Sequence, residues 1–158
     1  MRLICQRGRN KNPGDFYRNT PEIINKGLSK VKDALNTLNI DIEMKAAAEY
    51  YIDFEFEQKI EKEKFLTFGD NYILVELPFI EEPKNLIGII FKLQLEGYKV
   101  VLAHPERYAY YKMEDYNELK NRGVLLQINL LSLIGYYSPQ IQRKTEQLIE
   151  ENIVSIPF

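Results

Sequence analysis

The sequence has few of the features on which several classes of protein depend. It holds one cysteine in 158 residues, which excludes a framework of intramolecular disulfides and is typical of a protein of the reducing cytosol. No apolar run approaches the roughly 20 residues of a transmembrane helix. Residues 1–14 lack the apolar core of a secretory signal. The formal net charge of −2 gives no electrostatic basis for binding nucleic acid. These absences predict a cytoplasmic protein with neither a membrane span nor a nucleic-acid partner.

The patterning predicts a single α/β domain. Hydrophobic residues make up 45% of the 158-residue sequence, which is enough to form one core. Segments with helical spacing alternate with short apolar segments, which favours a mostly parallel sheet with helices outside it. Residues 1–14 show no periodicity, so we expect them to be irregular. The expected helices cover about 20–39, 53–60, 85–97, 114–121 and 138–151; the expected strands cover 42–48, 72–77, 99–103, 124–128 and 153–156, with 65–68 and 72–77 forming a hairpin.

The only histidine, His104, lies where an apolar, β-branched strand is expected to end. In parallel α/β proteins the side chains at the carboxyl ends of strands face the ligand crevice. A neutral imidazole there can bind a metal, and Arg107, three residues later, can hold a phosphate. Glu49 and Asn129 also fall at expected strand ends, and Glu76 is a further candidate. The sequence therefore indicates metal-assisted phosphate chemistry.

Each candidate also has an interpretation without chemistry. A lone histidine at a strand end is more often a hydrogen-bonded structural residue than a ligand. Glu49 can be a solvated carboxylate, and Asn129 can cap the turn that follows it. Arg107 can be a surface arginine paired with an acidic neighbour, Glu106 or Asp115.

Cys5 is a weaker candidate. The segment from Cys5 to Lys11 superficially resembles the loop of thiol-dependent phosphatases, which places an arginine six residues after its cysteine. Position 11 is a lysine, and no convincing strand precedes the segment. The sequence therefore argues against a cysteine nucleophile.

Four segments in order carry a family resemblance. They resemble the bacterial PHP-superfamily (polymerase and histidinol phosphatase) protein-tyrosine phosphatases of capsular and exopolysaccharide loci, over about residues 15–152. The segments are Ala46–Tyr51 (AAAEYY), Ala103–Tyr108 (AHPERY), Arg122–Asn129 (RGVLLQIN) and Ser132–Tyr137 (SLIGYY).

The resemblance implies a distorted (β/α), TIM-like barrel with a cluster of divalent metals, usually manganese, at the carboxyl ends of the strands. It implies hydrolysis of phosphotyrosine on proteins, notably bacterial tyrosine kinases of polysaccharide export, by a metal-activated water. Glu49 matches a metal-bridging glutamate and His104 a single-metal ligand. Arg107 matches the arginine that contacts the substrate phosphate, a catalytic and substrate-binding position.

The departures from the family leave two hypotheses open. The family carries a His-x-His pair, a Thr-Pro-His segment and an Asp-x-His pair, and this sequence has none of them. We therefore expect residues 1–158 to form one incomplete PHP-like domain, a partial barrel that looks truncated at both ends. One hypothesis is a tyrosine phosphatase that uses Glu49, His104 and Arg107. The other is a catalytically inactive fragment that at most binds a partner. The tyrosine-phosphatase segments disfavour a histidinol-phosphate phosphatase.

Overall fold

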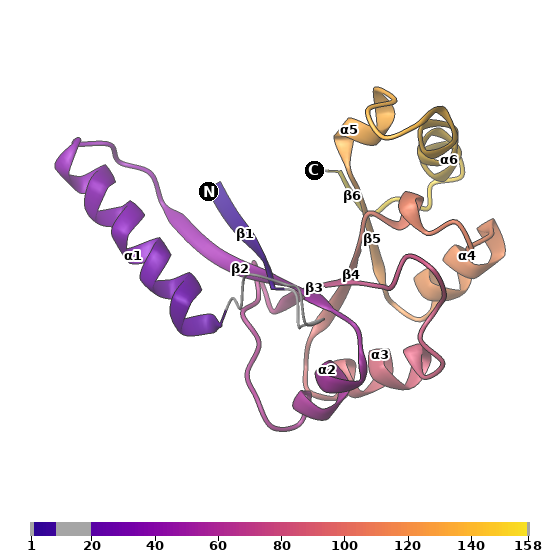
Figure 1. Ribbon diagram of the computed structural model, residues 1–158, viewed down its shortest axis with the longest axis horizontal. Coiled ribbons are helices and arrows are strands. Elements are labelled where there is room, and N and C mark those ends of the chain that lie inside the picture. Colours follow the sequence, from indigo (N-terminus) through magenta and orange to yellow (C-terminus); the bar gives the residue numbers. More distant parts are fainter. Residues whose placement is uncertain (1, 9–19, 158) are drawn as a thin grey trace.

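The computed structural model describes residues 2–8 and 20–157, which contain one six-stranded parallel sheet (Figure 1). Its strands lie in the same order in space as in the sequence, as they do in a (β/α) barrel. In a doubly wound sheet, by contrast, the order of the strands reverses part of the way across the sheet. The expected partial barrel is therefore confirmed. The strands are β1 (Arg2–Gly8), β2 (Met44–Tyr51), β3 (Tyr72–Glu76), β4 (Lys99–Ala103), β5 (Leu125–Ile128) and β6 (Ile156–Pro157).

Three of the helices begin directly after a residue whose side chain caps them. The side-chain oxygens of Thr20, Asp53 and Ser138 each accept a hydrogen bond from the backbone N–H three residues later, which satisfies a free donor of the first turn. No helix within the described ranges is long and apolar enough to cross a membrane. The helices are α1 (Pro21–Thr37), α2 (Phe54–Lys59), α3 (Leu86–Leu95), α4 (Met113–Asn121), α5 (Leu130–Leu133) and α6 (Pro139–Glu150), with a 3₁₀ turn η1 (Pro105–Arg107).

The expectation of an irregular N-terminus is wrong for residues 2–8. These residues form β1, which pairs in parallel with β2 along its whole length, from Arg2 opposite Met44 to Gly8 opposite Tyr50. Their sequence lacks the local pattern of a strand. They form one because their backbone pairs with β2, and the local sequence does not indicate that pairing. Residues 9–14 lie outside the described residues.

The expected hairpin is wrong in its first arm. Phe68 pairs with Tyr72 as a single antiparallel bridge around the turn at 69–71, and residues 65–67 form no strand. Both edges of β3 are occupied by parallel neighbours, β2 and β4, so a longer antiparallel arm has no edge on which to pair.

The two faces of the sheet have different roles. Alternate strand residues such as Val75, Leu102 and Leu126 lie on one face of the sheet. They pack against helices α3, α4 and α6, and together these side chains form the main core. Their neighbours Leu74 and Val101 lie on the other, inner face in a small separate cluster. Figure 1 shows α2, α3 and α4 together on one side of the row of strands.

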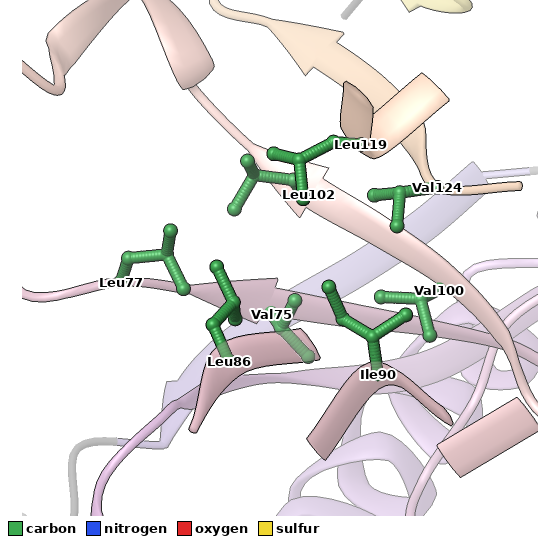
Figure 2. Close-up of a pocket in the computed structure, with 8 residues that line it drawn as sticks. All are labelled: Val75, Leu77, Leu86, Ile90, Val100, Leu102, Leu119 and Val124. Atoms are coloured by element: carbon green, nitrogen blue, oxygen red, sulfur yellow. The ribbon is translucent and has the colours of Figure 1, made fainter. Parts of the chain in front are cut away.

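The core between the sheet and α3 and α4 holds a void of about 10 Å³. Figure 2 shows that only aliphatic side chains surround it. A void that small and apolar offers no partners even to a water molecule. The void therefore offers no site for a polar ligand. The lining residues are Val75, Leu77, Leu86, Ile90, Val100, Leu102, Leu119 and Val124.

A buried tyrosine joins the carboxyl ends of β3 and β4. The hydroxyl of Tyr108 accepts a hydrogen bond from the N–H of Leu77 (2.9 Å) and donates one to the carbonyl of Ala103 (3.2 Å). Tyr108 is 0% exposed, and burial raises the pKa of its hydroxyl well above the usual value, so the group stays neutral. Lys144 of α6 donates to the carbonyls of Tyr108 and Tyr111, which fixes the same loop from outside.

We predict that Tyr108→Phe lowers the free energy of unfolding by about 1–3 kcal/mol, because it leaves the buried Leu77 N–H without a partner. Urea denaturation measures this change. The control is Tyr98→Phe, which removes a half-buried hydroxyl that accepts from Phe65 N–H, and should cost less. A Tyr108 variant as stable as the control would contradict this role.

Candidate metal centre

Three neighbouring strands bring Glu49, Glu76 and His104 together. Glu49 lies two residues before the end of β2, Glu76 is the last residue of β3, and His104 directly follows β4. Glu49 pairs in register with Leu74, which lies on the inner face, and Glu76 lies two residues beyond Leu74. Because strand side chains alternate between faces, both carboxylates face inward. The sequence placed Glu49 at the end of its strand, and the structure places it inside β2.

The three side chains are in direct contact. The Nε2 atom of His104 lies 3.3 Å from Oε1 of Glu49 and 3.2 Å from Oε2 of Glu76. One ligand atom from each residue lies within 4.8 Å of the other two. The side chain of Glu76 is 1% exposed, and those of His104 and Glu49 are 10% and 14% exposed. The site is therefore a largely buried acidic cluster that includes one imidazole.

His104 adopts an unusual backbone conformation. Its φ of 37° and ψ of 54° lie in the left-handed region, which a non-glycine residue seldom occupies. Pro105 follows, and a proline disfavours helical angles in the residue before it. The N–H of His104 donates to the carbonyl of Gln127 on β5 (2.7 Å), which holds this turn in place. Strain of this kind costs about 1–3 kcal/mol and is found mostly at functional positions.

The two carboxylates set the charge of the imidazole. Burial by itself lowers the pKa of His104, but hydrogen bonds to Glu49 and Glu76 outweigh burial and raise the pKa above the usual value. The two hydrogen bonds favour a proton on Nε2, between the two carboxylates. A divalent cation bound by the same atoms would replace that proton, because a metal-bound imidazole nitrogen is deprotonated.

The donor set fits a divalent metal. Two carboxylate oxygens and one imidazole nitrogen suit hard to borderline cations such as manganese. Ligands that bind one octahedral ion at right angles lie about 3 Å apart, close to the spacing of Nε2 from each carboxylate. The Nδ1 atom of His104 is buried and has no hydrogen-bond partner among the described residues, so no group there holds a particular tautomer.

Arg107 lies beside this cluster, on η1. Its guanidinium carbon is 4.9 Å from the ring centroids of both Phe79 and Tyr137. Phe79 also stacks against the imidazole of His104, at 5.7 Å between centroids. The positive charge of Arg107 acts to lower the pKa of His104, so the two groups are within electrostatic reach of each other. The alternative that pairs Arg107 with Glu106 or Asp115 finds no support in the salt bridges of the described residues.

Asn129 takes both roles that the sequence left open. Its Oδ1 accepts from the N–H of Leu131 (3.0 Å) and so caps α5, and its Nδ2 donates to the hydroxyl of Tyr137 (2.9 Å) beside Arg107. Sequence reasoning ranked Glu76 as a secondary candidate and did not include it among the metal ligands. Its position as the last residue of an apolar strand was the available signal. The side chain of Cys5 lies outside the described part of the chain.

A parallel barrel segment with carboxylate and imidazole donors at the strand ends, beside an arginine, is typical of metal-dependent phosphate hydrolases. Comparison with known protein families identifies the family to which the chain belongs. Residues 12–156 match the family described as "Capsular polysaccharide synthesis, CpsB/CapC", and the chain belongs to this family. The expected PHP-type fold agrees with this membership.

Two curated relatives cover most of the chain. The tyrosine-protein phosphatase YwqE of Bacillus subtilis (strain 168) is 30% identical over 141 residues, which are 87% of this chain and 56% of YwqE. The CapC protein of Staphylococcus aureus is 26% identical over 140 residues, or 87% of this chain and 55% of CapC. The chain therefore spans a little more than half the length of these relatives.

A solved structure shows the same fold. It comes from crystal structures of YwqE from Bacillus subtilis and CpsB from Streptococcus pneumoniae, which are described as metal-dependent tyrosine phosphatases. The TM-score is 0.79 with 29% sequence identity, over 90% of this chain and 59% of that chain.

We predict that Mn²⁺ stabilises the protein and that EDTA reverses this effect. At 100 times the dissociation constant a ligand adds about 2.7 kcal/mol, which corresponds to a rise in Tm of roughly 5–10 °C for a chain of this size. Glu76→Gln keeps the shape of the side chain but removes one anionic ligand, so it should abolish most of the shift in a thermal melt.

The matched control is Glu118→Gln, which removes an exposed carboxylate that pairs with Arg122 and does not belong to the cluster. This variant should keep the full Mn²⁺ shift. Equal shifts in the two variants would mean that Mn²⁺ binds elsewhere.

Proposed function

We propose that this protein is a metal-dependent protein-tyrosine phosphatase that acts in the regulation of capsular or exopolysaccharide synthesis. The observation that carries the proposal is the contact of Glu49, Glu76 and His104 at the carboxyl ends of three strands, with Arg107 beside them. The activities named for YwqE and CpsB support it. We also propose that residues 1–158 form a single PHP-like domain, since β1 and β6 belong to one sheet.

The residues divide the chemistry between them. Glu49, Glu76 and His104 would hold the metal. When bound, a divalent ion supplies an activated water and neutralises charge on the phosphoryl oxygens. Arg107 would bind the phosphate, because its planar guanidinium can donate two parallel hydrogen bonds to phosphoryl oxygens. The rings of Phe79 and Tyr137 keep that guanidinium from turning freely.

We propose manganese as the metal and a phosphotyrosine protein as the substrate. Two carboxylates favour a hard cation, and the imidazole favours manganese over calcium or magnesium. Phe79 is 38% exposed beside Arg107, so an aromatic surface adjoins the place where the phosphate would bind. Such a surface suits the ring of phosphotyrosine. We propose a bacterial tyrosine kinase of polysaccharide export as the substrate protein, in keeping with the family's link to capsular polysaccharide synthesis. We propose that the reaction takes place in the cytoplasm.

A second candidate is a protein that binds the metal and a phosphorylated tail without turnover. One observation favours it: the cluster provides three ligands within the described residues, and His104 is the only histidine of the sequence. Binding of phosphotyrosine without release of phosphate would distinguish this candidate from the enzyme.

We predict Mn²⁺-dependent release of phosphate from a phosphotyrosine peptide, with little release from a phosphoserine peptide. Glu49→Ala, His104→Ala and Arg107→Ala should each reduce kcat/KM by at least about tenfold, since each removes a ligand or the phosphate contact. A phosphate-release assay measures this. The control is Arg122→Ala, an exposed arginine paired with Glu118, which should retain activity. Activity that survives all three site substitutions would place the reaction elsewhere.

A further inference from the structure

Glu106 is a buried carboxylate that the proposed chemistry does not use. It is 1% exposed and lies on η1 between His104 and Arg107. The salt bridges of the described residues give it no cationic partner. Its Oε2 atom is buried and has no hydrogen-bond partner in the same part of the chain. Burying a carboxylate without a cation is costly, so this position calls for a physical explanation.

The hydrogen bonds of Glu106 lead across the site to α5. Its Oε1 atom accepts a short hydrogen bond from the hydroxyl of Ser132 (2.6 Å) and a second from the backbone N–H of Asn129 (3.1 Å). These two hydrogen bonds connect the turn that carries Arg107 to the N-cap residue and the third residue of α5, 23 and 26 positions later in the sequence.

The same network returns to Arg107 from the other direction. The side chain of Asn129 donates from Nδ2 to the hydroxyl of Tyr137, and the ring of Tyr137 lies 4.9 Å from the guanidinium carbon of Arg107. The contacts therefore close a ring: Glu106, Asn129, Tyr137 and Arg107, with the peptide bond between Glu106 and Arg107 as the last link. Glu106 is thus connected both to the backbone of Arg107 and, through Asn129, to an aromatic ring that lies against its side chain.

We propose that Glu106 is a positioning residue that holds the guanidinium of Arg107 in the orientation needed to receive a phosphate. Only the direction of this positioning, toward a phosphate, rests on the proposed function. The immobilisation of Arg107 by Glu106 is inferred from the contacts alone and does not depend on that function. A preoriented arginine binds an anion with less loss of side-chain entropy than a mobile one.

The test measures the mobility of Arg107 directly. In ¹⁵N NMR, the Nε–Hε signal of Arg107, assigned by its disappearance in Arg107→Lys, should show an order parameter near the rigid value of about 0.85. Glu106→Ala and Ser132→Ala should lower it, in the first case below about 0.6, and move the signal as the guanidinium leaves the rings. Glu106→Gln keeps an acceptor for both donors and should retain most of the order.

The control and the second measurement separate positioning from stability. Tyr98→Phe also removes one hydrogen bond, at the opposite ends of the strands, and should leave the Arg107 signal unchanged. Binding of O-phosphotyrosine in the presence of Mn²⁺, measured by calorimetry, should weaken about tenfold in Glu106→Ala and little in Glu106→Gln.

The outcomes are distinct. Unchanged order of Arg107 in both Glu106→Ala and Ser132→Ala would overturn the proposal and leave Glu106 as a tether between η1 and α5, even if both variants melt at lower temperature. If the unaltered protein binds no phosphotyrosine, the proposed function fails, and the order parameter still decides whether Glu106 positions Arg107. If Glu106→Ala does not fold, Ser132→Ala, which removes the shorter of the two bonds, provides the result.

Discussion

Repulsion between two close carboxylates, buried Glu76 and half-buried Glu49, is the constraint on which the site depends. Oxygens of Glu49 and Glu76 lie within 4.8 Å of each other, where two unit charges at an effective dielectric constant of 20 repel by about 3.5 kcal/mol. Positive charge close to both carboxylates relieves this repulsion. The imidazole of His104 lies 3.2 and 3.3 Å from them, and hydrogen bonds to both carboxylates raise its pKa, which favours the charged form. A divalent cation would supply positive charge more completely, which is why the arrangement points to a metal.

The surroundings of the cluster keep these charges in place. Ala47 lies two residues before Glu49 on the same face, and Ala103 directly precedes His104; both are buried and leave room for the larger ligands. The hydroxyl of Tyr108 donates to the carbonyl of Ala103 at the end of β4, and that of Tyr116 donates to the carbonyl of Pro105 in the following turn; Lys144 of α6 donates to the carbonyl of Tyr108. The strained conformation of His104 persists because these contacts over-determine it.

Aromatic residues link the metal cluster to the arginine. Phe79 stacks on the imidazole of His104 and lies against the guanidinium of Arg107, and Tyr137, in the loop between α5 and α6, lies against Arg107 as well. Hydrogen bonds from Asn129 connect that loop to Glu106 on η1. The site thus has two parts with different supports: ligands set by the register of the strands, and an arginine set by a network of loops.

Local signals in the sequence predicted most of the elements. Caps and apolar spacing located the five longer helices within a few residues, and the apolar run before His104 located β4 with its bounds. The sequence missed β1, because a strand whose pairing is its main support has no local signature. It missed α5, a single turn whose cap, Asn129, fits a simple loop equally well. The hairpin predicted from the sequence was too long, because local patterns do not show that β2 and β4 occupy both edges of β3.

The sequence by itself determined the chemistry available: one histidine at a strand end, an arginine three residues later, and carboxylates placed near the ends of apolar strands. Those facts are local, since period-two alternation and strand length are written into neighbouring residues. Tertiary structure alone decided which residues meet. The parallel register brought Glu76 as well as Glu49 to His104, and the left-handed turn aimed the imidazole at both. The partners of Arg107 are likewise set by the tertiary structure: they are Phe79 and Tyr137 and not an acidic neighbour. Contacts between distant segments depend on how strands and loops pack, so the local sequence does not indicate them.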